Sequence, residues 1–216
     1  MFEDRLDAGR RLALSMQKYR GKDVVVLAIA RGGVPVGYQV ARYLHAEFDI
    51  IVALKLPYPH NAETGFGAVA EDGTTFVFPD AFDKFDKGTI EDVVQQQQDE
   101  LYRRISALRA GNPLINIEKK TVILVDDGIA MGSTMRVCVT LCKNRRAKRI
   151  VVASPVCGRD IEKEFAALVD EVVVLDTPSD CHAVAQVYLN WLDVSDREVI
   201  DLVHGWEYEK QRVIGH

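Results

Sequence analysis

The stretch TVILVDDGIAMGSTM, residues 121–135, combines an apolar strand, two carboxylates and the start of a helix. Its first five residues are apolar or β-branched, as in strands that are covered on both faces. Asp126 and Asp127 follow, and a loop with Gly128 and Gly132 leads to Met135, where apolar side chains take up helical spacing. The stretch therefore predicts a strand, a loop and a helix joined as a unit of a parallel α/β fold.

Units of this kind recur along the chain. Apolar, β-branched runs occupy residues 23–30, 48–54, 121–127, 149–155 and 171–176. Three of them are followed by apolar stripes at helical spacing, namely Val36, Val40, Tyr43 and Leu44; Met135, Cys138, Val139 and Cys142; and Ile161, Phe165 and Leu168. This alternation predicts a doubly wound, mostly parallel sheet of about five core strands flanked by helices.

One domain should span residues 1–216. We expect an opening helix over residues 4–19 and a hood with the C-terminal helices over residues 176–216. Ser195 and Glu198 have the spacing of a capping box, which predicts the start of the last helix.

An insertion, residues 56–118, separates the second and third core strands. Its first part, residues 57–67, is polar and carries glycine, which indicates a mobile flap or an ordinary surface loop. Two short strands should follow at residues 67–70 and 75–78. Apolar spacing then predicts a long helix through residues 91–110.

The composition is that of a globular protein with one sizeable core. Of the 216 residues, 48% are hydrophobic and 27% are charged. The formal net charge of -5 gives no reason to expect nucleic acid as the main partner. No apolar segment is long enough to span a bilayer, and the acidic first residues do not have the pattern of a secretory signal. We therefore expect a cytoplasmic protein without a membrane partner.

The cysteines and histidines do not indicate a metal centre. Cys138, Cys142, Cys157 and Cys181 lack a paired C-x-x-C spacing, and three of them lie in apolar surroundings. This favours free buried thiols over disulfides or a zinc site. The histidines are scattered singly, which is typical of surface or packing roles.

Two loops should lie where a parallel sheet binds its ligands, beyond the carboxyl ends of the strands. In residues 126–134, two carboxylates can accept hydrogen bonds from a vicinal diol or hold a divalent cation, and the backbone behind them can wrap a phosphate. In residues 31–33, Arg31 offers a fork-shaped cation beside two glycines, which suits a diphosphate. Taken alone, each loop could also be a capped turn or a tight connection with a surface arginine. Together they indicate a ribose 5-phosphate with a diphosphate.

These motifs resemble those of the type I phosphoribosyltransferases. VILVDDGIAMGST, residues 122–134, is similar to the thirteen-residue phosphoribosyl diphosphate motif of that family, and IARGG, residues 29–33, resembles its diphosphate loop. The resemblance covers roughly residues 24–176. ETGFGAVAEDG, residues 63–73, and VSDREV, residues 194–199, further resemble a bacterial and archaeal branch of the family.

The resemblance implies a transfer reaction with phosphoribosyl diphosphate as the donor. A nitrogen nucleophile on a base or related acceptor displaces magnesium diphosphate from the anomeric carbon, through a transition state with oxocarbenium character. Mg²⁺ is the implied cofactor and a homodimer the implied assembly. The protein's contribution is chiefly positioning and charge stabilisation.

The resemblance also assigns roles to residues. Asp126 and Asp127 bind the ribose 2- and 3-hydroxyls, directly or through Mg²⁺ and its water shell. Arg31, Lys55 and Asp127 are the implied catalytic residues. The other implied contacts are Gly32 and Gly33 at the diphosphate, Gly128, Ala130, Met131, Gly132, Ser133 and Thr134 around the 5-phosphate, and Glu63 at the base or the magnesium ion.

Two positions depart from the family pattern. Ala130 stands where members that act on 6-oxopurines carry an aspartate, which argues against a hypoxanthine, guanine or xanthine enzyme with that mechanism. Met131 stands where the family usually has a threonine whose hydroxyl contacts the phosphate. Loss of that donor could cost roughly 1–3 kcal/mol of binding. Weakened donor affinity, a different ligand and lost catalysis all remain open.

Base recognition and the function class are the remaining questions. The hood offers Asp176, Thr177, Pro178, Tyr188 and Trp191 as base contacts, but the spacing of Tyr188 and Trp191 from Val184 and Val187 predicts a helical face packed on the core. The leading hypothesis is an enzyme, and the alternative is a non-catalytic regulatory protein that binds phosphoribosyl diphosphate or a nucleotide. A dinucleotide enzyme is disfavoured because the G-x-G-x-x-G order is absent.

Overall fold

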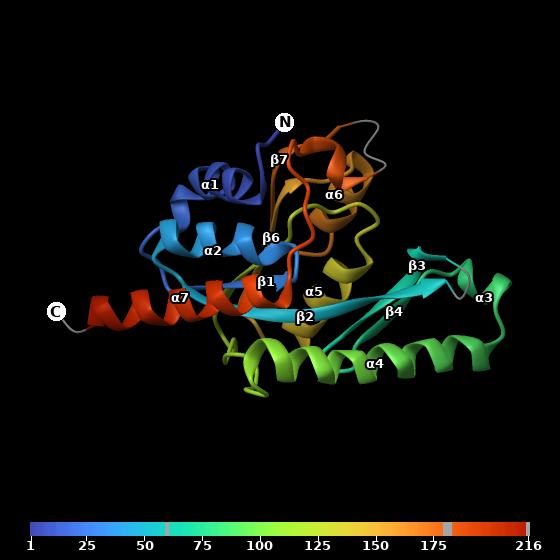
Figure 1. Ribbon diagram of the computed structural model, residues 1–216. Helices are drawn as coiled ribbons and strands as arrows, with labels where there is room; N and C mark the ends of the chain where they lie inside the picture. Colours follow the sequence, from blue (N-terminus) through green and yellow to red (C-terminus); the bar gives the residue numbers. More distant parts are fainter. Residues whose placement is uncertain (59–60, 179–182, 215–216) are drawn as a thin grey trace.

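The computed structural model describes residues 1–58, 61–178 and 183–214, except for the side chains of residues 61–63 and 211–214. Seven described strands form one sheet in the order β4-β3-β2-β1-β5-β6-β7 (Figure 1). The strands are β1 (Val24–Ala30), β2 (Glu47–Tyr58), β3 (Asn61–Ala70), β4 (Thr75–Val77), β5 (Thr121–Val125), β6 (Arg149–Val156) and β7 (Glu171–Asp176).

Five of these strands form the parallel core that the sequence predicts. β1 pairs in parallel with β2 and β5, and β5, β6 and β7 follow in parallel. β3 and β4 extend the same sheet with antiparallel pairing beyond β2. The doubly wound α/β prediction is confirmed, and the inserted residues lengthen the sheet on one side.

Helices connect and cover the strands. They are α1 (Arg5–Ser15), the short 3-10 helix η1 (Gln17–Tyr19), α2 (Gly33–Leu44), α3 (Ala81–Lys84), α4 (Lys87–Arg109), α5 (Ser133–Asn144), α6 (Arg159–Ala166), the 3-10 helix η2 (Val184–Val187) and α7 (Asp196–Ile214). The long helix predicted in the insertion is confirmed as α4. The predicted capping box before α7 is also confirmed, since Ser195 and Glu198 exchange hydrogen bonds. No described helix is long and apolar enough to cross a bilayer.

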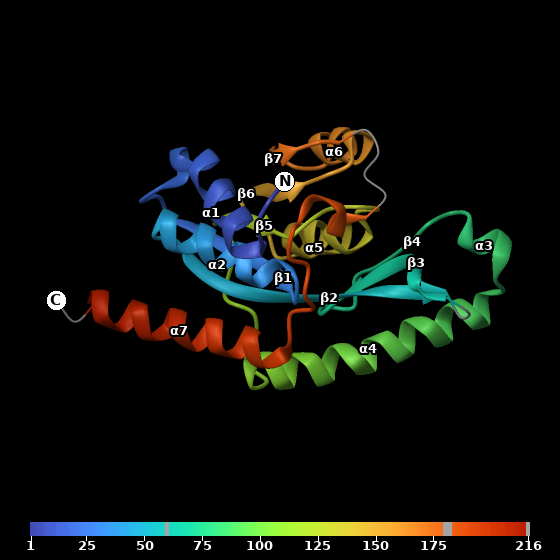
Figure 2. The same ribbon diagram turned by 45° about the horizontal axis from the view of Figure 1, so that its top comes forward.

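The core has two layers because both faces of the sheet are covered. Along β1, Val26 and Ala28 face a cluster that includes α1, α2 and α7, while Val25 and Leu27 face a cluster that includes α5 and α6. Figure 2 shows α1 and α2 on one side of the sheet and α5 and α6 on the other. A continuous apolar run in β1 follows from this double coverage.

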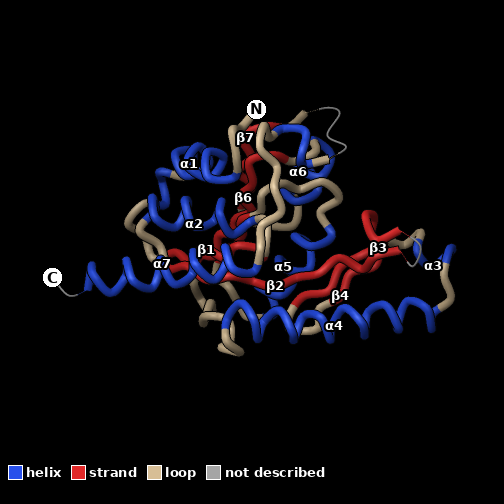
Figure 3. Tube along the Cα trace, viewed as in Figure 1, coloured by secondary structure: helices blue, strands red, loops and turns tan. Residues whose placement is uncertain are grey.

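The polar flap predicted over residues 57–67 is wrong as a loop. β2 continues to Tyr58 and β3 begins at Asn61, and the two strands pair in antiparallel fashion and project from the core (Figure 3). Residues 59–60 of the predicted flap lie outside the described residues. Gly67 is required there, because a Cβ on it would lie 2.1 Å from the carbonyl oxygen of Phe76 on β4. Gly65 and Gly67, a residue type uncommon inside strands, gave the appearance of a loop.

The helix predicted through Tyr188 and Trp191 is also wrong, although the predicted packing is confirmed, since Tyr188 is buried against Phe2 and Ala8 and Trp191 packs against this cluster. Among the described residues there, only η2 is helical, and the chain is irregular from Tyr188 until α7 begins. We call residues 183–195 the hood segment. Its conformation is fixed by distant partners: the Phe2 N–H donates to the Val187 carbonyl over 2.7 Å, and the Leu189 N–H donates to the Phe2 carbonyl over 2.9 Å. The first residues of the fold thus pair directly with the hood segment.

Three cysteines, Cys138, Cys142 and Cys157, are buried and unoxidised, as expected; Cys181 lies outside the described residues. Burial raises the pKa of Cys142 to about 12. Since the thiolate is the reactive form, a pKa near 12 leaves roughly one Cys142 thiol in ten thousand ionised at pH 8, against about a quarter for an ordinary thiol.

We therefore expect the Cys181→Ser variant to react with a disulfide reagent at least about 1,000-fold more slowly when native than when unfolded in urea. The measurement is the rate of thiol labelling in both states. The unsubstituted protein is the control, because its labelling differs from that of the variant only by the contribution of Cys181. Rapid labelling of one full equivalent in the native variant would contradict the buried placement.

Candidate functional site

The site lies at the carboxyl ends of β1 and β5, which are neighbouring parallel strands. We call residues 31–33 the β1–α2 junction and residues 126–134 the β5–α5 junction. A Cβ on Gly32 would lie 2.2 Å from Asp127 Oδ2, and one on Gly33 would lie 2.7 Å from the Val125 carbonyl oxygen. The two junctions therefore pack against each other so closely that only glycine fits. The peptide bond between Ala30 and Arg31 is cis.

The β5–α5 junction presents free backbone donors. Within the described ranges, no protein acceptor contacts the backbone N–H groups of residues 130–134. These groups precede or open α5, where the helix dipole adds partial positive charge. Gly132 has φ +74°, and a Cβ on it would lie 2.8 Å from the Phe165 ring. Such a turn of unpaired N–H groups at a helix N-terminus is suited to an anion such as phosphate.

Side chains of the same junction differ in exposure. Ser133 is buried, Ala130 and Thr134 are half-buried, and Met131 is 52% exposed. Gly128 packs against the hood segment, since a Cβ there would lie 2.2 Å from Val184 Cγ1. The exposed thioether of Met131 brings no hydroxyl donor to the anion site.

Asp126 and Asp127 share a poorly solvated environment. Desolvation raises the pKa of Asp126 well above its usual range, and the neighbouring Asp127 carboxylate raises it further. Burial also raises the pKa of Asp127, while the Arg5 guanidinium opposes that rise. The Asp127 N–H donates to Asp126 Oδ1 over 2.9 Å. A cation near Asp126 would therefore favour the ionised pair.

Arg5 and Tyr188 belong to the site, although no sequence pattern selected Arg5. Arg5 Nε donates to Asp127 Oδ2 over 2.7 Å, and both side chains are nearly buried. The Tyr188 hydroxyl donates to the Asp127 carbonyl oxygen over 2.6 Å. Burial raises the pKa of Tyr188, which keeps this hydroxyl protonated as a donor. The first contact joins two residues that are 122 positions apart in the sequence, and the second joins two that are 61 positions apart. No local spacing predicts such contacts.

The other predicted site residues lie around this centre. Arg31 is partly exposed and pairs with Asp196 at the start of α7, Nη1 to Oδ1 over 3.4 Å. Lys55 lies within β2, and its side chain crosses Gly65 of β3. Glu63 lies in β3, but its side chain is outside the described part of the chain.

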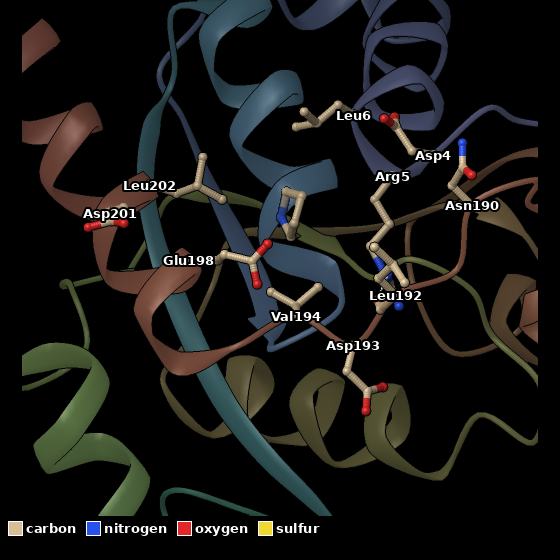
Figure 4. A pocket seen from close by; sticks show the side chains of 11 residues that line it. Asp4, Arg5, Leu6, Asn190, Leu192, Asp193, Val194, Glu198, Asp201 and Leu202 are labelled. Carbon is tan, nitrogen blue, oxygen red and sulfur yellow. Dashed lines mark hydrogen bonds between the residues drawn. The ribbon is translucent and has the colours of Figure 1, made fainter.

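A cavity of about 630 Å³ opens on the other side of Arg5. Figure 4 shows the Arg5 side chain reaching from α1 toward Leu192, with Val194 from the segment before α7 and Glu198 from the first turn of α7. Its apolar lining comes mainly from Leu6, Leu192 and Leu202, and neither Asp126 nor the junction residues 130–134 line it. The cavity is thus adjacent to the site but is not the anion-binding junction.

The acidic pair fits a magnesium ion that a ligand helps to hold. Mg²⁺ typically keeps waters and takes one or two carboxylates together with substrate phosphate oxygens. No group of three or more potential ligands from His, Cys, Asp and Glu occurs among the described residues. Asp126 and the second carboxylate oxygen of Asp127 suit that open arrangement better than a closed protein cage.

Comparisons with known proteins identify the family to which the chain belongs. A family model described as "Phosphoribosyl transferase domain" matches residues 2–190. Two Mycobacterium tuberculosis proteins, from strains CDC 1551 / Oshkosh and ATCC 25618 / H37Rv and each named "Putative phosphoribosyl transferase", are 40% identical over 202 residues. The match covers 93% of this chain and 46% of each relative, so the chain spans about half the length of these curated relatives.

One solved structure also matches the fold of the chain. The crystal structure of TT1426 from Thermus thermophilus matches with a TM-score of 0.78 and 34% sequence identity, covering 95% of this chain and 98% of that one. The family model covers the strands, both junctions and most of the hood segment. The chain belongs to the phosphoribosyl transferase domain family.

Proposed function

We propose that the protein is a magnesium-dependent phosphoribosyltransferase that uses phosphoribosyl diphosphate as donor to a nitrogenous base or related acceptor. The observation that carries this proposal is the run of unpaired N–H groups at residues 130–134, placed directly behind the two carboxylates. A phosphate bound at the junction and a sugar diol bound at the carboxylates would together belong to one ribose 5-phosphate. A homodimer and a cytoplasmic location, both taken from the family resemblance and the sequence, belong to the same proposal.

The proposed reaction depends mainly on the positioning of the donor and the acceptor. A nitrogen of the acceptor forms a bond to the anomeric carbon while the bond from that carbon to the diphosphate oxygen breaks, and the diphosphate leaves with both electrons. Mg²⁺ supplies charge neutralisation at the leaving group when bound. Arg31 can turn toward the diphosphate at small cost, because its pair with Asp196 is long and partly exposed. Lys55 is a further cation for that role.

The direct test is release of diphosphate from phosphoribosyl diphosphate with magnesium, screened against purines, pyrimidines and small amines. We expect turnover with at least one acceptor, and none in the variant that carries asparagine at both Asp126 and Asp127. Tight donor binding without turnover on any acceptor would favour the alternative, a regulatory protein that binds phosphoribosyl diphosphate or a nucleotide. The exposed Met131 in the anion junction is the observation that favours that alternative. Absence of donor binding would overturn both.

Met131→Thr is expected to tighten donor binding. A threonine hydroxyl would add a hydrogen bond to an anion worth roughly 1–3 kcal/mol, or about a 5- to 150-fold lower Kd. Calorimetric titration with phosphoribosyl diphosphate and magnesium measures the change. Met131→Val is the matched control, because valine has the shape of threonine without its hydroxyl. Equal affinities for the threonine and valine variants would contradict a phosphate contact at this position.

A further inference from the structure

Arg5 makes three contacts that hold the hood segment to the β5–α5 junction. Its Nε donates to Asp127 Oδ2 over 2.7 Å, and its Nη1 donates to the Leu192 carbonyl over 2.5 Å. The guanidinium carbon also lies 3.7 Å from the centre of the Trp191 ring. Because Arg5 belongs to α1, one side chain links α1, the hood and the end of β5.

Asp127 is enclosed by these contacts. Its Oδ2 faces Arg5 on one side and the backbone of Gly32 on the other, where a Cβ would come within 2.2 Å. Its carbonyl oxygen accepts from the Tyr188 hydroxyl. With 12% of its side chain exposed, Asp127 has little room at Oδ2 for a sugar hydroxyl.

Asp126 has a different environment. It is more exposed than Asp127 and makes no ion pair with a basic side chain in the part of the chain that the structure describes. Gly33 packs against one side of it, where a Cβ would lie 3.1 Å from Asp126 Oδ1, so the approach from the β1–α2 junction is closed. Its partly exposed remainder makes Asp126 the more accessible of the two carboxylates for a ligand.

We propose that Arg5 is a positioning residue that separates the roles of the two carboxylates. The positive charge of Arg5 neutralises Asp127, and Arg5, held in place by Asp127, anchors the hood segment. Asp126 binds the diol of the donor. This inference rests on the proposed function for the ligand of Asp126, whereas the anchor does not depend on it. This arrangement also lowers electrostatic repulsion. The donor carries several negative charges, and the pairing of Asp127 with Arg5 leaves one unpaired carboxylate near the donor instead of two.

Trp191 gives a direct readout of the anchor. The chain has 2 tryptophans, so the Trp206→Phe background leaves Trp191 as the single fluorescent tryptophan. In that background, Arg5→Met and Asp127→Asn should each raise the acrylamide quenching constant of Trp191 at least about twofold. Arg5→Met removes the guanidinium that covers the ring, and Asp127→Asn removes the ion pair that holds this guanidinium in place. Both should lower Tm by roughly 6–20 °C, the effect of breaking one nearly buried ion pair in a chain of this size. Asp126→Asn is the matched control and should leave the quenching unchanged.

Donor binding separates the two carboxylates. Titration with phosphoribosyl diphosphate and magnesium, well below each variant's Tm, should show a Kd raised roughly 10- to 150-fold in Asp126→Asn, the value of a hydrogen bond to a charged group. Asp127→Asn should lose less than about tenfold, and Arg5→Lys should keep more affinity than Arg5→Met because it retains the charge.

The outcomes are distinguishable. Equal loss of affinity in both asparagine variants, with unchanged quenching of Trp191, would overturn the inference and leave the proposed function intact. No donor binding by the unsubstituted protein would overturn the proposed function and with it the role of Asp126, while the quenching and Tm measurements would still decide whether Arg5 anchors the hood through Asp127.

Discussion

Replacing Arg109 with methionine is expected to lower the free energy of unfolding by about 3–5 kcal/mol, because it leaves the buried Glu71 carboxylate without its partner. Arg109 Nη2 lies 2.9 Å from Glu71 Oε1, and the two side chains are 5% and 4% exposed. Both side chains also bond the backbone of β2. Arg109 Nη1 donates to the Ile50 carbonyl, and the Val52 N–H donates to Glu71 Oε2. Urea denaturation measures the loss.

Two comparisons make this prediction specific. Arg103→Met removes an ion pair with Glu100 on the same helix, but Arg103 is 60% exposed, so a loss below about 1 kcal/mol is expected. The double variant Arg109→Met with Glu71→Gln should lose less than the sum of the two single variants, because no unpaired charge remains buried. Additive losses, or equal effects at Arg109 and Arg103, would show that the pair is not an isolated buried unit.

Gly33→Ala is expected to lower donor affinity by roughly 100-fold or more, as displacements of about 1 Å in a binding constellation can do. The added Cβ would lie 2.7 Å from the Val125 carbonyl oxygen and 2.9 Å from Asp126 Cα. Both atoms are backbone, so no side chain can rotate away, and the β1–α2 and β5–α5 junctions must separate. Overpacking of this kind should also destabilise the fold by about 1–3 kcal/mol.

Calorimetric titration with phosphoribosyl diphosphate and magnesium measures the effect of Gly33→Ala. Gly158→Ala is the control on a neighbouring strand end, because its Cβ would meet nothing closer than 3.7 Å and its φ is −61°. The control should bind the donor as the unsubstituted protein does. Unchanged affinity in Gly33→Ala would mean that the contact between the two junctions does not shape the donor site.

The sequence was sufficient for the parallel core and for the position of the two junctions. Apolar runs such as β1 and β5 are covered on both faces, so their residues are apolar at nearly every position and are recognisable without a partner. Once the strands are parallel, their carboxyl ends meet at one edge, which brings residues 31–33 and 126–134 together. Local patterns and one topological rule therefore account for this part of the site.

The paired strands β2 and β3 and the hood could not be read in the same way. The strand predicted at residues 67–70 is confirmed as the end of β3, but Gly65, which close neighbours across the sheet require, looks in sequence like a loop residue. In the hood segment, Tyr188 and Trp191 have helical spacing but are held by Arg5, Phe2 and Asp127, which are far away in the chain. Contacts of that separation leave no local periodicity, so Arg5 was missed and the hood was assigned as a helix.

The pairing of Phe2 with Tyr188 has a consequence for the order of folding. Contacts between distant residues carry the largest cost in loop-closure entropy, so they form favourably only after intervening structure has brought their ends together. The parallel core can assemble from β1, α2, β2 and β5 before the hood segment reaches the first residues. A nascent chain from which the hood segment has not yet emerged therefore carries both junctions without the hydrogen bond from Tyr188 to Asp127, and we expect the candidate site to be completed late in folding.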